Sequence, residues 1–235
     1  MNYRFVHLPE TDSTNHWLAA HADEHDMVVW TDFQTAGRGC GTNSWESEPG
    51  QNLLFSMLIH PTDVAPARQF AISMAISLDI VRTLQPLVTH GELSIKWPND
   101  IYWNDRKLAG ILIESQIAAG LIRQCIIGAG LNVNQTLFRS DAPNPVSLRQ
   151  ITGQQHDREA LLRQIADRFT LDISADDYRA LLYRRRGMHP YRDAQGDFTA
   201  ELLTVEDDGH LLLRDSQQHT RRYAFKEVTF LKSEE

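Results

Sequence analysis

The most informative stretch of the chain reads Lys96-Trp97-Pro98-Asn99-Asp100, and Arg106-Lys107-Leu108-Ala109-Gly110 follows it closely. Cations, an amide and a carboxylate gather here around a proline, and Asn104-Asp105 predicts a tight turn between the two motifs. This composition is typical neither of a core strand nor of a solvated helix, which Pro98 would break. We interpret the stretch as strand ends and loops that carry ligand-binding side chains.

Outward from this stretch, the hydrophobic pattern predicts an α+β architecture, with a mixed sheet backed by helices up to about residue 185. The expected strands are 27–33, 52–59, 93–95, 101–103, 107–115 and 121–133, with turns at Asn104-Asp105 and Ala119-Gly120. The expected helices are Thr14–Ala20 with Ser13 as its N-cap, a long amphipathic Pro66–Leu84, and two helices within 157–186 that break near 171–175.

Beyond Gly187 the character of the sequence changes. Short strand candidates at 198–205, 210–214 and 221–225 are separated by turns, a spacing that predicts a small β-barrel or sandwich. We therefore expect two domains, residues 1–186 and 187–235. All 5 tryptophans precede the boundary, so the first domain holds most of the large aromatic side chains available for recognition.

Bulk properties exclude several classes of protein. A net charge of −8 over 235 residues argues against a protein built mainly to hold nucleic acid. The basic run Arg184-Arg185-Arg186 is expected at the end of a helix, where cations meet the negative end of the dipole. Cys40 and Cys125 are too few for a disulfide framework, which indicates a reducing compartment. Neither a signal peptide nor an apolar run approaching the roughly 20 residues of a membrane span is evident, so we expect a cytoplasmic protein.

The segment from Gln34 to Gly50 is expected to be a long loop, and loops of that length in compact domains are often functional. Its Gly37-Arg38-Gly39 motif is a weak signal alone and fits neither a dinucleotide fingerprint nor a P-loop. Arg38 between two glycines nevertheless suits an anion, because the backbone can approach closely and the guanidinium is always charged. Such a loop can close over a phosphorylated intermediate.

Each candidate also has an ordinary interpretation. Lys96 and Lys107 could be exposed strand lysines, and Asp100 could be a turn former. Their concentration, together with Asn132, favours a nucleotide or acyl-phosphate site.

Five blocks in the order and at the spacing found in biotin–protein ligases give the chain a close resemblance to that family. The blocks are Thr11-Asp12-Ser13-Thr14-Asn15, Gln34 to Gly39, Asn43-Ser44-Trp45, the two lysine motifs, and Gly128 to Asn132. The resemblance implies a class II synthetase-like catalytic fold with a C-terminal SH3-like barrel, in a short form that lacks an N-terminal DNA-binding domain. It also implies the family's reaction: biotin and Mg-ATP give biotinyl-5′-adenylate, which a lysine of a biotin carboxyl carrier protein then attacks. A homodimer is compatible with the family.

The resemblance assigns roles to individual residues. Catalysis is expected from Lys107, Arg38 and Asp100, with Asp100 orienting the acceptor lysine. The expected biotin-binding residues are Ser13, Thr14, Asn15, Gln34, Gly37, Arg38, Gly39, Cys40, Lys107 and Gly110. The expected ATP-binding residues are Arg38, Asn43, Trp45, Lys96, Asn99, Lys107 and Asn132. No protein ligand for a metal is identified, and Mg²⁺ is expected to arrive with ATP.

Cys40 and Thr42 depart from the family pattern, which usually has arginine or glutamine at the first position and glycine at the second. This departure could change loop closure or retention of the adenylate. The main alternative function is a lipoate- or octanoate-protein ligase or transferase of the same superfamily. A DNA-binding repressor is disfavoured because the Ser13 block begins so near Met1, and a non-catalytic nucleotide-binding module is disfavoured by Arg38 and Lys107. His21 and His25 are four residues apart but are expected on an exposed face.

Overall fold

The computed structural model describes residues 3–139 and 144–232. Residues 1–2 and 140–143 of the first expected domain and residues 233–235 of the second lie outside the described residues. A seven-stranded sheet and a five-stranded sheet organise the chain. The strands of the large sheet are β1 (Arg4–Thr11), β2 (Met27–Gln34), β3 (Leu53–Ile59), β4 (Leu93–Lys96), β5 (Asp100–Trp103), β6 (Arg106–Ala118) and β7 (Leu121–Leu131). The helices are α1 (Thr14–His21), α2 (Phe70–Leu84), α3 (Leu148–Thr152), α4 (Arg158–Arg168) and α5 (Ala175–Ala180), with 3₁₀ turns at Pro66–Arg68 and Gln85–Leu87.

The large sheet has the order β1-β2-β3-β7-β6-β5-β4. β1 runs parallel to β2, whereas every other neighbouring pair is antiparallel, so the sheet is mixed as predicted. The turns at Asn104 and at Ala119-Gly120 join β5 to β6 and β6 to β7, with positive φ angles of 50°, 52° and 74°. β1 and α3 were not predicted from the sequence.

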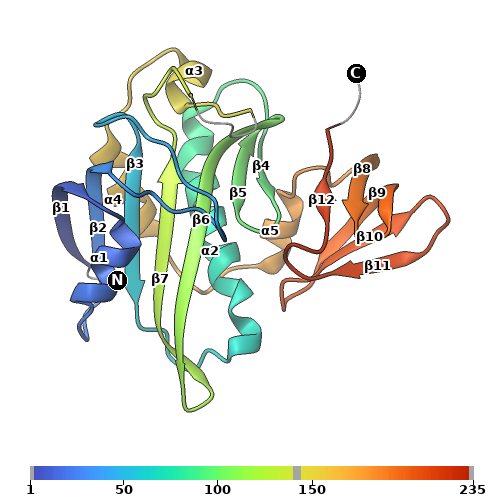
Figure 1. Ribbon diagram of the computed structural model, residues 1–235, viewed down its shortest axis with the longest axis horizontal. Coiled ribbons are helices and arrows are strands. Elements are labelled where there is room, and N and C mark those ends of the chain that lie inside the picture. The colour runs from blue at the N-terminus through green and yellow to red at the C-terminus, as the bar shows by residue number, and fades with distance from the viewer. Residues whose placement is uncertain (1–2, 140–143, 233–235) are drawn as a thin grey trace.

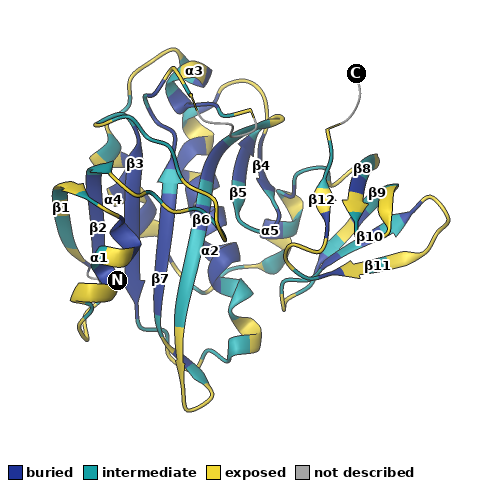
Figure 2. Ribbon diagram, viewed as in Figure 1, coloured by how far each residue is buried: buried dark blue, intermediate teal, exposed yellow. Residues whose placement is uncertain are grey.

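Helices cover both faces of the large sheet (Figure 1). Side chains of β2 alternate between the two faces. Met27 and Val29 pack with Leu18 of α1 on one face. Val28 and Trp30 belong to the main core on the other face, which also contains the buried residues of α2 and α4. The central strands are buried almost throughout (Figure 2). On the face that carries it, α1 packs against β2, β3 and β7.

The helix expected at Pro66–Leu84 exists, but it is not amphipathic. A 3₁₀ turn precedes α2, and 12 of the 15 residues in α2 are buried. The cause is packing on several sides, because α2 contacts the sheet, α4 and α5. By length and composition alone, the 22-residue segment Pro66–Leu87 could cross a membrane, although the sequence pattern had suggested no such run. It is a core helix here, with 67% of its most apolar window buried inside the protein.

The second sheet has the order β11-β10-β9-β8-β12 and is antiparallel. Its strands are β8 (Met188–Asp193), β9 (Gly196–Val205), β10 (Leu211–Asp215), β11 (Thr220–Tyr223) and β12 (Thr229–Phe230), of which β8 and β12 were not predicted. The expectation that Arg184–Arg186 end a helix is wrong. α5 stops at Ala180, and Arg184 has a φ of +59°, outside any helix.

Candidate active site

A pocket of about 500 Å³ lies on the face of the large sheet that carries α1. Ligand pockets in proteins commonly enclose roughly 300–1,000 Å³. The start of α1, the loop after β2, the strands β6 and β7, the Lys96–Asp100 motif and a turn of the second sheet all contribute to its walls. The pocket can therefore hold an extended small molecule that crosses several strands.

Most of the residues predicted from the sequence meet in this pocket, although they are far apart in the chain. Those that line it are Ser13, Thr14, Asn15, Gln34, Arg38, Gly39, Cys40, Asn43, Trp45, Lys96, Asn99, Asp100, Lys107 and Gly110. Two predicted residues, Gly37 and Asn132, do not line it. Asn132 is only 3% exposed, and its amide nitrogen donates to the carbonyl of Val146 at 3.1 Å. At Gly37, a Cβ would lie 2.6 Å from the carbonyl oxygen of Trp45, so glycine is needed there for close approach of the backbone.

A chain of polar contacts forms the end of the pocket beside α1. The Gln34 side-chain oxygen accepts from the Thr14 backbone N–H at 2.8 Å and lies 3.1 Å from the Thr14 hydroxyl. The buried Ser56 hydroxyl lies 2.7 Å from the Thr14 oxygen and 2.6 Å from Asn15 Oδ1. Ser13 occupies the N-cap position of α1 without the side-chain hydrogen bond that the sequence suggested. These small donors and acceptors suit a neutral polar ring of a ligand.

Glu114 joins this polar end to the glycine-rich loop, and sequence reasoning missed it. Asn15 Nδ2 donates to Glu114 Oε2 at 2.7 Å, and Arg38 Nη2 donates to Glu114 Oε1 at 3.2 Å. Arg38 is about half exposed, so this ion pair is weak and can exchange for a ligand anion. Glu114 lies within β6. A glutamate at a solvent-facing position of a strand is common, so nothing in the sequence indicated that this residue belongs to a site.

Lys107 and Asp100 form the charged centre of the pocket. Lys107 Nζ lies 2.7 Å from Asp100 Oδ1, and the two side chains are only 24% and 21% exposed. They meet because β5 pairs with β6 across the turn at Asn104-Asp105. Lys107 Nζ also lies 5.6 Å from the centre of the Trp45 ring, within the range of a cation–π contact. The ammonium group is thus held in place, with one carboxylate as its partner, before any ligand arrives.

The loop after β2 runs over the face of the large sheet (Figure 1). Trp45 of this loop lines the pocket. The loop folds back on itself, because Trp45 N–H donates to the Gly37 carbonyl at 2.9 Å and Gly39 N–H donates to Asn43 at 2.7 Å. Trp45 packs on Gly130 so closely that a Cβ there would lie 2.4 Å from the indole ring. Its buried Nε1 has no hydrogen-bond partner among the described residues. An arriving ligand could supply the missing acceptor.

The Lys96–Asp100 motif contributes two further polar groups. Lys96 Nζ lies 3.1 Å from the Tyr102 hydroxyl and 5.4 Å from the centre of the Phe230 ring. Burial lowers the pKa of Lys96, and nearby Asp100 partly opposes this effect. Asn99 donates to the Ile111 carbonyl at 2.6 Å, which ties the motif to β6. Lys96 therefore approaches the pocket from the side nearest to the second sheet.

The second sheet completes the pocket, which the sequence did not suggest. Its contributions are Phe225, Lys226, Val228, Thr229 and Phe230, from the turn after β11 and from β12. Trp97 connects the two sheets, because its Nε1 donates to the Gly209 carbonyl at 2.8 Å. Only the tertiary arrangement brings these segments, more than a hundred positions apart, to one site.

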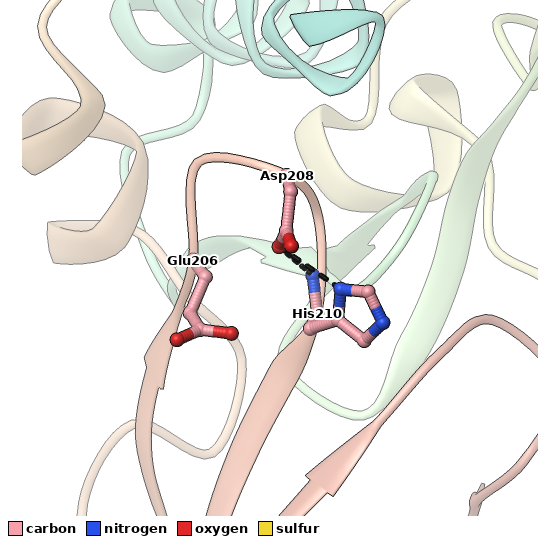
Figure 3. A group of neighbouring side chains, drawn as sticks. All are labelled: Glu206, Asp208 and His210. Atoms are coloured by element: carbon pink, nitrogen blue, oxygen red, sulfur yellow. Dashed lines mark hydrogen bonds and ion pairs between the residues drawn. The ribbon is translucent and has the colours of Figure 1, made fainter. Parts of the chain in front are cut away.

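A second cluster, of possible metal ligands, does not line this pocket. Glu206, Asp208 and His210 hold their ligand atoms within 4.8 Å of one another, at the turn between β9 and β10 (Figure 3). The carboxylates already have partners, because Arg222 donates to Glu206 and to Asp208 at 2.6 Å each. His210 Nδ1 also lies 2.9 Å from Asp208 Oδ1. We therefore interpret this cluster as a surface turn held by ion pairs. His21 and His25 are exposed, as expected, and do not form a metal site among the described residues.

Comparison with known proteins gives consistent results. Residues 6–132 match the Biotin/lipoate A/B protein ligase family. The chain is 28% identical to the Bacillus subtilis bifunctional ligase/repressor BirA, over 92% of this chain and 70% of that protein. It is 31% identical to the Mycobacterium tuberculosis biotin–[acetyl-CoA-carboxylase] ligase, over 77% of this chain and 70% of that protein.

A solved structure has the same fold. It is a biotin protein ligase from Aquifex aeolicus in complex with biotin and ATP. The TM-score is 0.80, at 23% sequence identity, with 97% of this chain and 99% of that chain covered. At this level of identity the likeness establishes the fold, including the mixed sheet and the small second sheet.

Proposed function

The chain belongs to the biotin/lipoate A/B protein ligase family, and from this premise we propose that it is an ATP-dependent biotin–protein ligase. One observation carries the proposal. The motif residues Arg38, Asp100 and Lys107 line the same pocket as the polar group at Thr14 and Gln34. A pocket with a neutral polar end and a charged centre suits an acid with a polar head, joined to a nucleotide.

In the first half-reaction, a biotin carboxylate oxygen attacks the α-phosphorus of ATP, and the bond to pyrophosphate breaks. We assign the biotin head to Ser13, Thr14, Asn15 and Gln34. Arg38 and Lys107 hold the carboxylate and the α-phosphate, which brings two anionic groups together and neutralises charge that builds up during displacement. Trp45, over Gly110 and Gly130, is positioned to cover the adenine, and Asn43, Lys96 and Asn99 are left for the rest of the nucleotide.

In the second half-reaction, the ε-amine of a carrier lysine attacks the acyl carbon, an amide bond forms, and AMP leaves. Asp100 is our candidate for orienting this amine and accepting its proton. Its present partner, Lys107, is drawn toward the phosphate in the ligand complex, which frees one carboxylate oxygen. The loop from Gln34 to Gly50 protects the adenylate from water when it closes.

Magnesium enters as part of the Mg-ATP substrate. Asp100 is the carboxylate that lines the described pocket, and it is paired with Lys107. One paired carboxylate does not make a site for a protein-held Mg²⁺, which favours several oxygen ligands. We therefore place the ion on the phosphates of ATP.

Further expectations complete the proposal. The proposed acceptor is a biotin carboxyl carrier protein. The relatives from Mycobacterium tuberculosis and Paracoccus denitrificans are named biotin–[acetyl-CoA-carboxylase] ligases, which supports a carboxylase component as the acceptor. Residues 1–186 form the catalytic domain and residues 187–235 an SH3-like domain. The enzyme works in the cytoplasm without binding nucleic acid or membrane, and a homodimer is compatible with its fold.

The alternative substrate is lipoate or octanoate, which the same family name includes. Relatives named as biotin ligases favour biotin. Exchange of labelled pyrophosphate into ATP distinguishes the acids, because exchange occurs only when the correct acid forms an adenylate. We expect exchange with biotin and none with lipoate or octanoate at equal concentration. Exchange with lipoate alone would contradict the proposal.

A further inference from the structure

A turn of the second sheet forms one wall of the pocket. Residues Ala224 to Glu227 make the turn, in which Glu227 N–H donates to the Ala224 carbonyl at 3.2 Å. Ala224 N–H donates to the Glu227 side chain at 2.7 Å, which fixes the turn from both ends. Phe225 packs edge-on against Trp97, with 6.4 Å between ring centres. The turn is therefore a built part of the site, held against the Lys96–Asp100 motif.

Lys226 occupies an unusual position in this turn. Its φ is +71°, a conformation that favours glycine and costs free energy for a residue with a side chain. Its ammonium group reaches across the pocket to the glycine-rich loop, where a Cβ added to Gly41 would lie 2.7 Å from Lys226 Nζ. A lysine in this conformation points a cation at the loop that crosses the site.

Lys226 also differs from the neighbouring cations in its partners. Arg38 is paired with Glu114, Lys107 is paired with Asp100, and Lys96 is bonded to Tyr102. For Lys226 no carboxylate lies within ion-pair distance among the described residues, and its ammonium group lies 5.6 Å from the centre of the Phe225 ring. Lys226 is thus an exposed pocket cation with neither an ion-pair nor a hydrogen-bond partner among the described residues, so it is available to an anionic group of a ligand.

The order of the strands indicates which anion this is. The polar end of the pocket lies at α1, β2 and β3, Lys107 lies on β6, and Lys96 lies at the end of β4, toward the second sheet. With the biotin head at the first end and the reacting phosphorus at Lys107, the leaving group must depart on the side opposite to the attacking carboxylate. That side is where Lys96 and Lys226 lie.

We propose that Lys226 binds the β- and γ-phosphates of ATP, so that the second sheet supplies a substrate-contacting residue for adenylation. This inference rests on the proposed function and deepens it. When pyrophosphate leaves, the anion bound to Lys226 leaves too. Lys226 therefore serves the first half-reaction and not the transfer of biotin from the adenylate to the carrier.

Lys226→Gly tests the proposal cleanly, because glycine suits the positive φ and removes only the side chain. In the pyrophosphate exchange assay, we expect the KM for ATP to rise about tenfold or more, since a charge-assisted contact is lost. The KM for biotin should stay within about twofold. Transfer from separately supplied biotinyl-adenylate to a carrier domain should also be unchanged. Lys226→Arg should restore most of the ATP affinity, because it keeps the charge.

Lys232→Ala is the matched control, since Lys232 is an exposed lysine of the same C-terminal region that does not line the pocket. A thermal melt checks that Lys226→Gly is folded, and we expect it to be at least as stable as the wild type. An unchanged KM for ATP in Lys226→Gly would overturn the proposal. The proposal would also be overturned if Lys226→Gly slowed transfer of biotin from supplied adenylate as much as it weakened the exchange reaction. If the wild type shows no biotin-dependent exchange, the proposed function itself is wrong.

Discussion

At the scale of single residues, Lys107 is the side chain on which the proposed chemistry depends most. Lys107→Ala removes a charge-assisted contact to carboxylate or phosphate, worth about 1.5–3 kcal/mol. Biotin-dependent pyrophosphate exchange should therefore fall at least about tenfold. The fold should survive, because Lys107 contributes little to the apolar core. The measurement is exchange beside a thermal melt, and wild-type exchange in this variant would remove Lys107 from its assigned role.

Cys40 tests whether the departure from the family pattern has chemical meaning. Cys40 lines the pocket and is partly buried. Among the described residues no base is hydrogen-bonded to its thiol, so Cys40→Ser should keep most ligase activity. Cys40→Arg should lengthen retention of the adenylate, because a guanidinium binds phosphate oxygens and a thiol does not. The measurement is the escape rate of labelled biotinyl-adenylate without carrier. Loss of both half-reactions in a folded Cys40→Ser protein would show that the thiol takes part.

At the scale of structural elements, the loop from Gln34 to Gly50 determines whether the adenylate is protected. The loop contacts the sheet through Arg38, which pairs with Glu114, and through Trp45, which packs on Gly130, whereas residues 41–44 are exposed. We expect proteases to cut it readily in the free enzyme and slowly with biotin and ATP together, because the ligand supplies the anion for Arg38. Limited proteolysis with mass spectrometry measures this. Equal cleavage rates with and without ligands would contradict the idea that the loop is a lid.

The sequence predicted elements well where the pattern is local. The strands β2 and β3 and the hairpins at Asn104 and Ala119 follow directly from β-forming runs and turn residues. β1 was missed because its charged and polar residues resemble an exposed segment, although it pairs in parallel with β2. α2 was predicted to be amphipathic because the sequence does not show that α4 and α5 also pack against it. These contacts arise only from tertiary packing.

The candidate site shows the same division between local and tertiary information. Motif residues such as Lys107 and Asp100 were predicted and do lie together. Glu114 and Lys226 were missed, because one is an ordinary strand glutamate and the other reaches the pocket only through packing of the second sheet. Asn132 was expected at the ligand, but it does not line the pocket, and its amide donates to the backbone carbonyl of Val146. An asparagine within a motif can hydrogen-bond to the backbone instead of to a ligand.

At the scale of the whole molecule, Asp79 links stability to pH. Asp79 lies in α2 and is 2% exposed, and burial raises its pKa from 3.8 to about 6, although Arg82 and Arg168 oppose this. The folded state then binds the proton more tightly than the unfolded state. The free energy of unfolding therefore falls as pH rises from about 4 to about 6, and stays lower above that range. The full effect corresponds to up to about 3 kcal/mol.

Asp79→Asn removes this penalty and keeps an acceptor for the backbone N–H of Thr170. We expect the variant to be more stable than the wild type at about pH 7.5 and not at about pH 4. Urea unfolding at both pH values measures the difference. Asp172→Asn, at an exposed carboxylate, is the control and should change stability little at either pH. A stabilisation that is equal at both pH values would show that ionisation of Asp79 is not its cause.

The central claim is that the complete pocket activates biotin and passes it to a lysine of another protein. The most direct measurement is incubation of the enzyme with labelled biotin, Mg-ATP and a biotin carrier domain, followed by peptide mapping of the label. We predict one biotin, joined by an amide bond to one carrier lysine, formed only with ATP and lost when that lysine is changed to arginine. Two results would contradict the claim. In one, the carrier stays free of biotin but accepts lipoate; in the other, the enzyme activates neither acid.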